Sequence, residues 1–162
     1  MYLYTLAFLK YKETILLLNR NKKPWKGSWN GVGGKRQENE SPLDCIIREI
    51  EEETTIRVIP AQIQDCGILT WTAFDAIGTG LHLFLVELDH CDLNTPKKTD
   101  EGILDWKDIP WVLDFENQGV AQNIPYFLPT ILQSKAKFHF HCTFENKHLV
   151  RVEEYPYVEP MI

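Results

Sequence analysis

GGKRQENESPLDCIIREIEEETTI, residues 33–56, joins a pair of glycines to a segment that ends in four closely spaced glutamates. Ser41 can cap a helix here, Pro42 suits the first helical position, and Asp44 completes a capping-box pattern. A stripe of apolar residues at helical spacing follows: Leu43, Ile46, Ile47 and Ile50. The pattern predicts an amphipathic helix that begins at Ser41 and buries one face.

Most glutamates of this segment share one face of the predicted helix. At about 100° per residue, Glu49, Glu52 and Glu53 fall together and away from the apolar stripe, whereas Glu51 points elsewhere. Like charges that face each other destabilise a helix, so something should offset their repulsion. A divalent cation such as Mg²⁺, which prefers oxygen ligands, is one such partner. A solvated, glutamate-rich surface is the alternative interpretation.

The rest of the chain reads as strands, one further helix and two loops. Strands are predicted at residues 2–9, 14–19, 62–71, 81–88, 103–106, 138–144 and 149–153. A second helix is predicted at 125–133, where a proline starts it. Residues 20–35 are rich in glycine and proline, which predicts a loop able to approach a ligand closely. Residues 114–123 are predicted to form a long polar loop.

Length and composition predict one globular domain. The chain has 162 residues and no repeat or linker, so a single domain over residues 1–162 is expected. Hydrophobic residues make up 44% and charged residues 25% of the chain, which is ordinary for a globular protein. Because predicted strands outnumber helices and the two are mixed along the chain, the expected fold class is α+β.

Charge and apolar patterning limit the possible partners. The net charge of -6 argues against binding a nucleic-acid polymer, although a single nucleotide stays a candidate. No apolar run has the length of a membrane helix or the layout of a signal peptide, so no membrane partner is expected and the protein is expected to be cytoplasmic. The four cysteines are scattered, which indicates reduced thiols. The oligomeric state stays open.

Two histidines offer a different metal site. His139 and His141 alternate in FHFHC and should share one face of a strand, with Cys142 on the other. They could contribute to a zinc site, but no acidic or thiol partner stands at the spacing that zinc sites use. A partly exposed strand face is the alternative interpretation.

The spacing across residues 34–56 resembles the Nudix box. The matching places are occupied by Gly34, Glu40, Arg48, Glu49, Ile50, Glu52, Glu53 and Ile56. Thr55 stands where the family has glycine, and a β-branched residue resists the left-handed helix end at a cost of about 1 kcal/mol or more. The resemblance implies the Nudix fold, in which a mixed β-sheet is sandwiched between helices in α/β/α layers.

The resemblance also implies a metal-dependent hydrolase of nucleoside diphosphates linked to another group. Its implied metal ligands are the Gly33 carbonyl and the carboxylates of Glu49, Glu52 and Glu53. Arg48 would orient the catalytic carboxylates and Glu40 would be its structural partner. A further acid from a later loop is implied as metal ligand or general base, with Glu101 as the candidate and Asp100 as the alternative. Catalytic roles are thus expected of Glu52, Glu53, Glu101 and Arg48, with Mg²⁺ or alternatively Mn²⁺ as cofactor.

Several segments outside the box are similar to the 8-oxo-dGTP diphosphatase branch of that family: YTLAFL, WNGVGGK, DEGILDW and FLPTILQSKAKFHFHCTFENK. This similarity implies that Asn30 contacts the purine edge, since an amide can both donate and accept. Candidate phosphate-binding cations flank the glycine loop, with solvated loop cations as the alternative: Arg20, Lys23, Lys26 and Lys35. Candidate aromatic walls of a base pocket are Trp29, Trp111, Phe74 and Phe127.

One departure leaves the substrate open. Vertebrate members of the branch carry two aspartates ahead of the second helix, and Asn123 and Ile124 stand there in this chain. The expected reaction is hydrolysis of 8-oxo-dGTP, or a related oxidised purine nucleotide, to the monophosphate and pyrophosphate. Hydrolysis of ADP-ribose, a dinucleotide or a nucleotide sugar is the rival, and a regulator that binds nucleotides without turnover is a further alternative.

Overall fold

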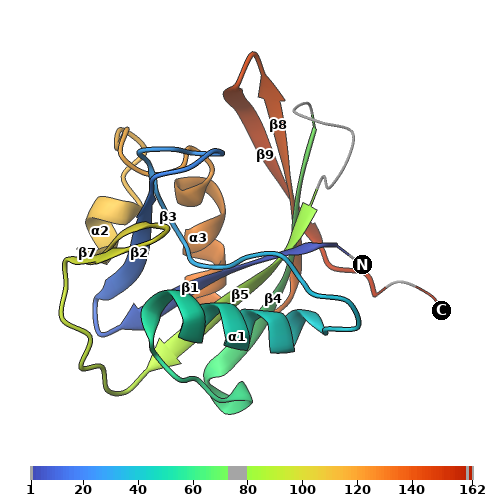
Figure 1. The fold of residues 1–162 in the computed structure, drawn as a ribbon. Coiled ribbons are helices and arrows are strands. Elements are labelled where there is room, and N and C mark those ends of the chain that lie inside the picture. Colours follow the sequence, from blue (N-terminus) through green and yellow to red (C-terminus); the bar gives the residue numbers. More distant parts are fainter. Residues whose placement is uncertain (1, 73–79, 160, 162) are drawn as a thin grey trace.

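One mixed β-sheet forms the centre of the molecule (Figure 1). The computed structural model describes residues 2–72, 80–159 and 161. The sheet has the strand order β6-β7-β2-β1-β5-β4-β8-β9, and β3 pairs with β2. Its strands are β1 (Tyr4–Tyr11), β2 (Thr14–Arg20), β3 (Trp29–Asn30), β4 (Ile63–Thr72), β5 (Gly80–Leu88), β6 (Lys97–Thr99), β7 (Gly102–Asp108), β8 (Phe138–Glu145) and β9 (His148–Pro156). The pairs β1–β5 and β4–β8 are parallel, and the other pairs are antiparallel.

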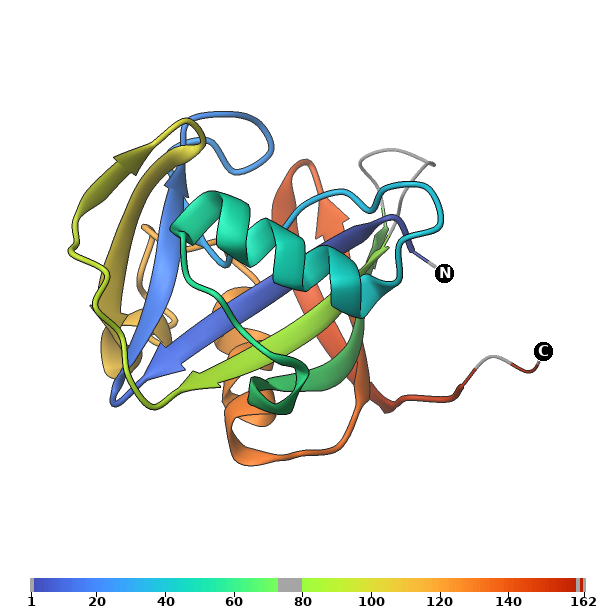
Figure 2. The same cartoon turned by 60° about the horizontal axis from the view of Figure 1, so that its bottom comes forward.

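Helices cover both faces of this sheet (Figures 1 and 2). They are α1 (Pro42–Thr54), the 3-10 turn η1 (Pro60–Gln62), α2 (Ile109–Val112) and α3 (Ile124–Gln133). Because side chains alternate along a strand, β1 contributes to two cores. Ala7 packs in the core on the α1 face with Ile46, and Phe8 packs in the core on the α3 face with Phe127. The predicted α+β fold, with a mixed sheet between helices, is confirmed.

The helix α1 follows its sequence signals closely. The Ser41 hydroxyl accepts a hydrogen bond from the Asp44 N–H at 3.1 Å, as an N-cap should. Ile46 and Ile50 are fully buried beneath the helix. At the other end, Thr55 adopts the left-handed conformation with φ of 66°, and its N–H donates to the Glu51 carbonyl. The helix therefore ends as a glycine would end it, although the residue is threonine.

Four short elements were not predicted. The strands β3 and β6 have two and three residues, α2 has four and η1 has three, so none carries a readable periodicity. The strand β7 extends beyond the predicted 103–106 because its whole length pairs with β2. The remaining elements differ from their predicted bounds by one to three residues at their ends.

The two histidines of β8 share one face, as predicted. His139 Nε2 and His141 Nδ1 each lie 2.7 Å from the Thr70 hydroxyl, while Cys142 is buried in the core. A threonine hydroxyl therefore lies between the two imidazoles. Over residues 2–72, 80–159 and 161, no helix combines the length and the apolar character that crossing a membrane requires.

Candidate functional site

The glycine loop before α1 runs alongside β1 and touches the helix. The Thr5 N–H donates to the Gly34 carbonyl at 2.9 Å, and the Gly34 N–H donates back to the Thr5 carbonyl at 3.1 Å. A Cβ on Gly33 would lie 2.0 Å from the Thr5 carbonyl oxygen, and one on Gly34 would lie 2.4 Å from Cδ of Glu49. Both distances are too short for any side chain. Glycine at these positions therefore lets the loop reach the carboxylate of Glu49.

Arg48 ties three glutamates to this loop. Its Nε and Nη2 donate to the two oxygens of Glu40, each at 2.8 Å. Its Nη1 donates to Glu49 at 2.8 Å and to Glu52 at 3.2 Å, and Nη2 also donates to the Lys35 carbonyl at 3.1 Å. A bidentate guanidinium–carboxylate pair fixes geometry as well as adding energy. Arg48 thus links α1 to the glycine loop, and its role in orienting catalytic carboxylates stays a prediction.

The three glutamates that Arg48 contacts differ in environment. The hydrogen bonds from Arg48 lower the pKa of Glu40 to about 2, and the side chain of Glu40 is only 12% exposed. Burial raises the pKa of Glu49, and the hydrogen bond from Arg48 works against that increase. Glu52 is 59% exposed. Glu40 and Arg48 therefore form a stable ion pair, whereas Glu49 carries a charge that is poorly solvated.

Glu53 has a buried oxygen without a partner. Among the described residues, its Oε2 is the buried side-chain oxygen or nitrogen that no hydrogen bond satisfies. Burial, together with the charges of Glu49 and Glu101, raises the pKa of Glu53 to about 8, although Arg20 and a hydrogen bond from the Gly33 backbone act in the opposite direction. A strongly perturbed carboxylate of this kind is typical of functional sites. A cation beside it would stabilise the charged form.

The turn between β6 and β7 brings Glu101 toward Glu53. Asn21 fastens this turn to the loop after β2, because its N–H donates to the Glu101 carbonyl and its Nδ2 donates to the Asp100 carbonyl, each at 3.1 Å. The charge of Glu101 contributes to the raised pKa of Glu53. Asp100 has an exposed side chain and is not among the main causes of that increase in the pKa of Glu53. Of the two candidates, Glu101 is the one that acts on the carboxylate cluster.

Two cations, Arg20 at the end of β2 and Lys22 in the loop after it, lie near these acids. The charge of Arg20 reaches Glu53, and its guanidinium is held in place by the Pro24 carbonyl at 2.9 Å. Lys22 was not predicted; its Nζ lies 3.6 Å from Oε1 of Glu101. Its only signal in the sequence is its position beside Arg20. The predicted cations at 23, 26 and 35 have exposed side chains and, within the described residues, form no ion pair with the cluster.

The donor set fits a divalent cation of the Mg²⁺ or Mn²⁺ type. The unpartnered oxygen of Glu53 and the poorly solvated carboxylate of Glu49 lie close enough for their charges to act on each other. In the part of the chain that the structure describes, no three His, Cys, Asp or Glu side chains already converge on one point. Arg48 holds one oxygen of Glu49 and one of Glu52. A bound cation would therefore use the other carboxylate oxygens of Glu49 and Glu52 or displace Arg48 from these two.

The strand β3 places Trp29 and Asn30 next to the glycine loop. The Trp29 N–H donates to the Gly119 carbonyl at 2.7 Å, so the polar loop 114–123 lies beside this strand. Oδ1 of Asn30 accepts from the Gly31 N–H at 2.8 Å. Its Nδ2 has no hydrogen-bond partner within residues 2–72, 80–159 and 161, which leaves a donor for a ligand.

Two of the predicted aromatic residues belong to one cation–π stack. Nζ of Lys107 lies 4.4 Å from the ring centroid of Trp29 and 5.3 Å from that of Trp111. Phe127 is instead fully buried in the core, and Phe74 lies outside the described residues. Of the described candidates, Trp29 and Trp111 share a partner, and Phe127 is a core residue. Sequence reasoning missed Lys107, which carried no motif.

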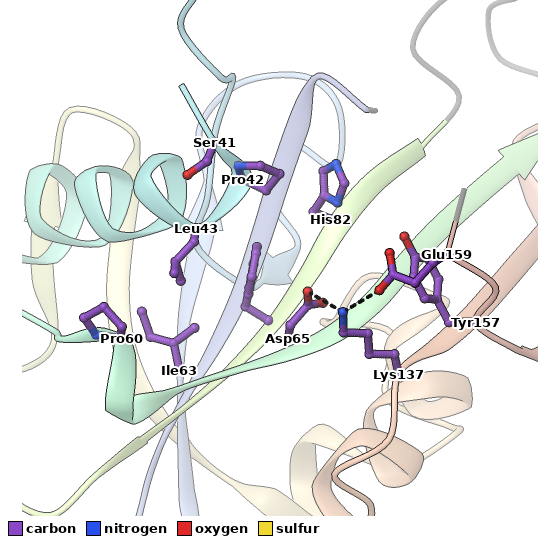
Figure 3. Close-up of a pocket in the computed structure, with 11 residues that line it drawn as sticks. Ser41, Pro42, Leu43, Pro60, Ile63, Asp65, His82, Lys137, Tyr157 and Glu159 are labelled. Carbon is purple, nitrogen blue, oxygen red and sulfur yellow. Dashed lines mark hydrogen bonds and ion pairs between the residues drawn. The ribbon is translucent and has the colours of Figure 1, made fainter. Parts of the chain in front are cut away.

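A separate cavity of about 290 Å³ lies beside the N-terminus of α1 (Figure 3). None of the predicted site residues lines it. The charged residues that line it form ion pairs with one another: Lys137 pairs with Asp65 at 3.4 Å and with Glu159 at 2.9 Å. Leu43 and Phe84 contribute apolar surface. The cavity therefore offers no free charge, and the carboxylate cluster at the C-terminal half of α1 is the stronger candidate site.

Most of the chain matches a known domain family. The NUDIX domain family matches residues 4–121, which include the glycine loop, α1 and Glu101. An uncharacterised Nudix hydrolase of Bacillus subtilis, YvcI, is 29% identical over 142 residues, which cover 86% of this chain and 85% of that protein. The oxidized purine nucleoside triphosphate hydrolase of Mus musculus is 28% identical over 152 residues, covering 91% and 90%. The crystal structure of a MutT protein from Bacillus halodurans has a TM-score of 0.73 and 25% identity, covering 95% and 97%.

Proposed function

This chain belongs to the NUDIX domain family, and we propose that it hydrolyses 8-oxo-dGTP, or a related oxidised purine nucleoside triphosphate, to the monophosphate and pyrophosphate. As a Nudix hydrolase it acts on pyrophosphate bonds. The observation that carries the proposal is the Glu53 carboxylate, which is buried, unpartnered at Oε2 and surrounded by acids and cations. Such a reaction would help to keep oxidised bases out of DNA.

The carboxylates have distinct tasks in this proposal. Glu49, Glu52 and Glu53, with the Gly33 carbonyl, would hold Mg²⁺ or Mn²⁺, in keeping with the general use of divalent metals by Nudix hydrolases. When bound, the metal polarises the phosphate chain and lowers the pKa of water. Arg48 keeps Glu49 oriented through its 2.8 Å hydrogen bond. Its bidentate pair with Glu40 anchors that orientation.

The proton and the developing charge are handled by other groups. Glu53 would accept the proton of the attacking water, with Glu101 as the alternative acceptor. Arg20 and Lys22 would offset negative charge as the leaving phosphate departs. Attack at the β-phosphorus places the water oxygen in pyrophosphate, while the bridging oxygen leaves with the monophosphate.

Two observations support an oxidised purine as substrate. The similarity to the mouse oxidized purine nucleoside triphosphate hydrolase extends over most of both chains. Asn30 retains a free Nδ2 beside the glycine loop, where it can donate to an acceptor on the purine edge. Asn123 is buried, with Nδ2 3.8 Å from Sγ of Cys142, so base recognition by that residue is not part of the proposal.

A substrate comparison tests this function. The purified protein is assayed with Mg²⁺ against 8-oxo-dGTP, dGTP, the other nucleoside triphosphates and ADP-ribose at one low concentration. We expect pyrophosphate release with strong preference for 8-oxo-dGTP, and ¹⁸O from labelled water in the pyrophosphate. Activity confined to ADP-ribose or another diphosphate would reject the substrate and keep the hydrolase. Binding without turnover of any compound would favour the regulatory alternative.

A matched pair of variants tests whether the carboxylate cluster of α1 is responsible for the activity. Glu53→Gln should abolish turnover while nucleotide binding persists, because the amide cannot accept the proton. Glu51→Gln lies on the same helix but pairs with Arg57 at the surface, so it should retain activity. Equal activity of the two variants would remove Glu53 from the mechanism.

A further inference from the structure

Arg36 fastens the loop before α1 to the start of the chain. Its Nη1 donates to the Tyr2 carbonyl at 3.0 Å, and its Nε and Nη2 donate to the Glu40 carbonyl at 3.0 Å and 2.6 Å. Its backbone N–H donates to the Leu3 carbonyl at 2.8 Å. A planar guanidinium has donors at fixed angles and can bridge two carbonyls in this way, whereas an ammonium lacks that fork. The half-buried side chain of Arg36 therefore fixes the backbone of Glu40.

Glu40 is held by an arginine at each of its ends. Arg36 binds its carbonyl, and Arg48 binds its two carboxylate oxygens, each at 2.8 Å. The Gln37 N–H adds a hydrogen bond to Oε1 of Glu40 at 3.0 Å. A fork of two charge-assisted hydrogen bonds fixes geometry as well as adding energy. A shift in the backbone of Glu40 would therefore move the guanidinium of Arg48.

The guanidinium of Arg48 also contacts two acids of the carboxylate cluster. Its Nη1 donates to Glu49 at 2.8 Å and to Glu52 at 3.2 Å. Hydrogen-bond partners behind a metal ligand orient that ligand, and their loss weakens metal binding or activity. Hydrogen bonds therefore run without a break from Arg36 through Glu40 and Arg48 to the carboxylates of α1.

Holding the loop beside β1 does not depend on the side chain of Arg36 alone. Paired backbone hydrogen bonds between Thr5 and Gly34 already join the loop to β1, and the backbone N–H of Arg36 adds a further bond just before this strand. The two bonds that its guanidinium donates to Glu40 are instead directed at the residue that holds Arg48. Arg36 stands between Gly34 and Glu40 and occupies none of the places that match the Nudix box. Its contacts therefore indicate a role that the box does not describe.

We infer that Arg36 is a positioning residue of the active site: by fixing the backbone of Glu40, it sets the position of Arg48 and with it the geometry of the carboxylate cluster. The inference rests on the proposed function, in which that cluster holds Mg²⁺ or Mn²⁺. Arg36 is not a catalytic residue, because its guanidinium donates to backbone carbonyls. Its loss should therefore lower kcat and metal affinity and leave the binding of the nucleobase unchanged.

The chain offers matched variants for a test. Arg36→Met removes every donor of the guanidinium and keeps an unbranched stem. Arg36→Lys keeps the charge without the fork and replaces Arg36→Met if that variant fails to fold. Arg57→Met is the control, because it makes the same exchange at an arginine that is 86% exposed and pairs with Glu51. Glu40→Gln weakens the link to Arg48, because an amide has one acceptor oxygen where the carboxylate has two. Circular dichroism establishes that each variant is folded.

Three measurements follow the hydrogen bonds outward from Arg36. For Arg36→Met we expect kcat to fall roughly tenfold, while the KM for the nucleotide stays close to the native value. The dissociation constant of Mn²⁺, measured by electron paramagnetic resonance without nucleotide, should rise roughly tenfold. The Nε–H of Arg48, followed by NMR in the metal-free protein, should exchange with solvent faster because its bond to Glu40 loosens. Arg36→Lys should show part of each effect, and Arg57→Met should show none.

A double-mutant cycle tests the route through Glu40. In the Glu40→Gln background, Arg36→Met should lower kcat and Mn²⁺ affinity by a much smaller factor than in the native protein. Equal factors in the two backgrounds would show that Arg36 acts by another route and would overturn the inference. So would an Arg36→Met protein that is less stable to urea but keeps the native kcat, Mn²⁺ affinity and Arg48 exchange, because Arg36 would then serve the fold alone.

Failure of the proposed function would look different. The native protein would then hydrolyse no nucleoside triphosphate, but Mn²⁺ affinity and the exchange of Arg48 would still report on Arg36, since neither measurement needs a substrate. A native protein without affinity for Mn²⁺ would overturn the inference together with the function.

Discussion

Gly34 lies so close to the carboxylate of Glu49 that a Cβ on the glycine would stand 2.4 Å from Cδ of the glutamate. The loop and the helix are therefore in direct contact at the candidate metal site. Gly34→Ala should displace Glu49, and a displacement near 1 Å lowers kcat/KM by roughly a hundredfold. Steady-state kinetics checks this. Gly119→Ala, whose Cβ would meet Asn117 Oδ1 only at 3.2 Å, is the control and should remain active.

Arg48 is expected to matter for stability as well as activity. Arg48→Ala leaves Glu40, which is 12% exposed, as a charge without its bidentate partner. We expect a loss of about 2–3 kcal/mol in the free energy of unfolding, measured by urea denaturation. Arg48→Lys should recover only part of it, because an ammonium cannot form the fork of hydrogen bonds.

The surface pair Arg57–Glu51 serves as the comparison for Arg48. Arg57 is 86% exposed and Glu51 is 48% exposed. Arg57→Ala should change stability by less than about 0.5 kcal/mol. An Arg48→Ala variant that is no less stable than Arg57→Ala would show that the network around Arg48 adds nothing to the fold.

Replacing Thr55 with glycine, the residue that the family has at this position, should stabilise the protein. Its φ of 66° strains a β-branched side chain, so Thr55→Gly should raise the free energy of unfolding by about 1 kcal/mol. Thr54→Gly is the contrasting variant. Thr54 is buried within the helix, and its hydroxyl donates to the Ile50 carbonyl at 2.6 Å, so that change should destabilise. Equal effects at the two positions would contradict the left-handed helix end.

The raised pKa of Glu53 predicts a pH dependence of the metal-free protein. The carboxyl titrates near 4.5 when unfolded and near 8 when folded. Between these values the unfolded chain has released a proton that the folded chain keeps, so stability is full below pH 4.5 and is lost as pH rises through 8. Glu53→Gln removes this loss. With a chelator at pH 8, the variant should be more stable than the native protein by roughly 1–3 kcal/mol.

Metal addition provides the control for that experiment. Mg²⁺ should stabilise the native protein against urea at pH 8, because it binds the folded state alone, and should stabilise Glu53→Gln much less. At pH 5 the native protein and the variant should be nearly equal without metal. A variant that is less stable than the native protein at pH 8 would mean that Glu53 is already compensated by the protein.

Variants that each remove one negative charge can show whether Glu101 or Asp100 is the functional acid. Glu101→Gln removes a charge that raises the pKa of Glu53, so the pH profile of kcat should move its acidic limb to lower pH and the rate should fall. Asp100→Asn should leave both nearly unchanged, because the side chain is exposed. Reversed results for the two variants would make Asp100 the functional acid.

Local signals predicted α1 well. The cap at Ser41, the apolar stripe and the shared face of Glu49 and Glu53 all depend on residues within a few positions of one another. Arg48 contacts Glu40 and Glu49, and its predicted orienting role stays a prediction. Local signals could not decide whether Glu101 or Asp100 is the better candidate acid. The turn that carries both residues is held in place by Asn21, which lies far away in the sequence.

The sequence by itself determined the family, the mixed class of the fold, the main strands and helices, and which acids belong to one helix face, since each of these follows from periodicity and spacing along the chain. Only the tertiary structure decided the parallel pairing of β1 with β5, the raised pKa of Glu53, the cation–π stack on Trp29 and the hydrogen bond from Arg36 to the Tyr2 carbonyl. Those features arise where segments remote in sequence meet, and burial, charge and packing depend on distances that the order of residues does not contain.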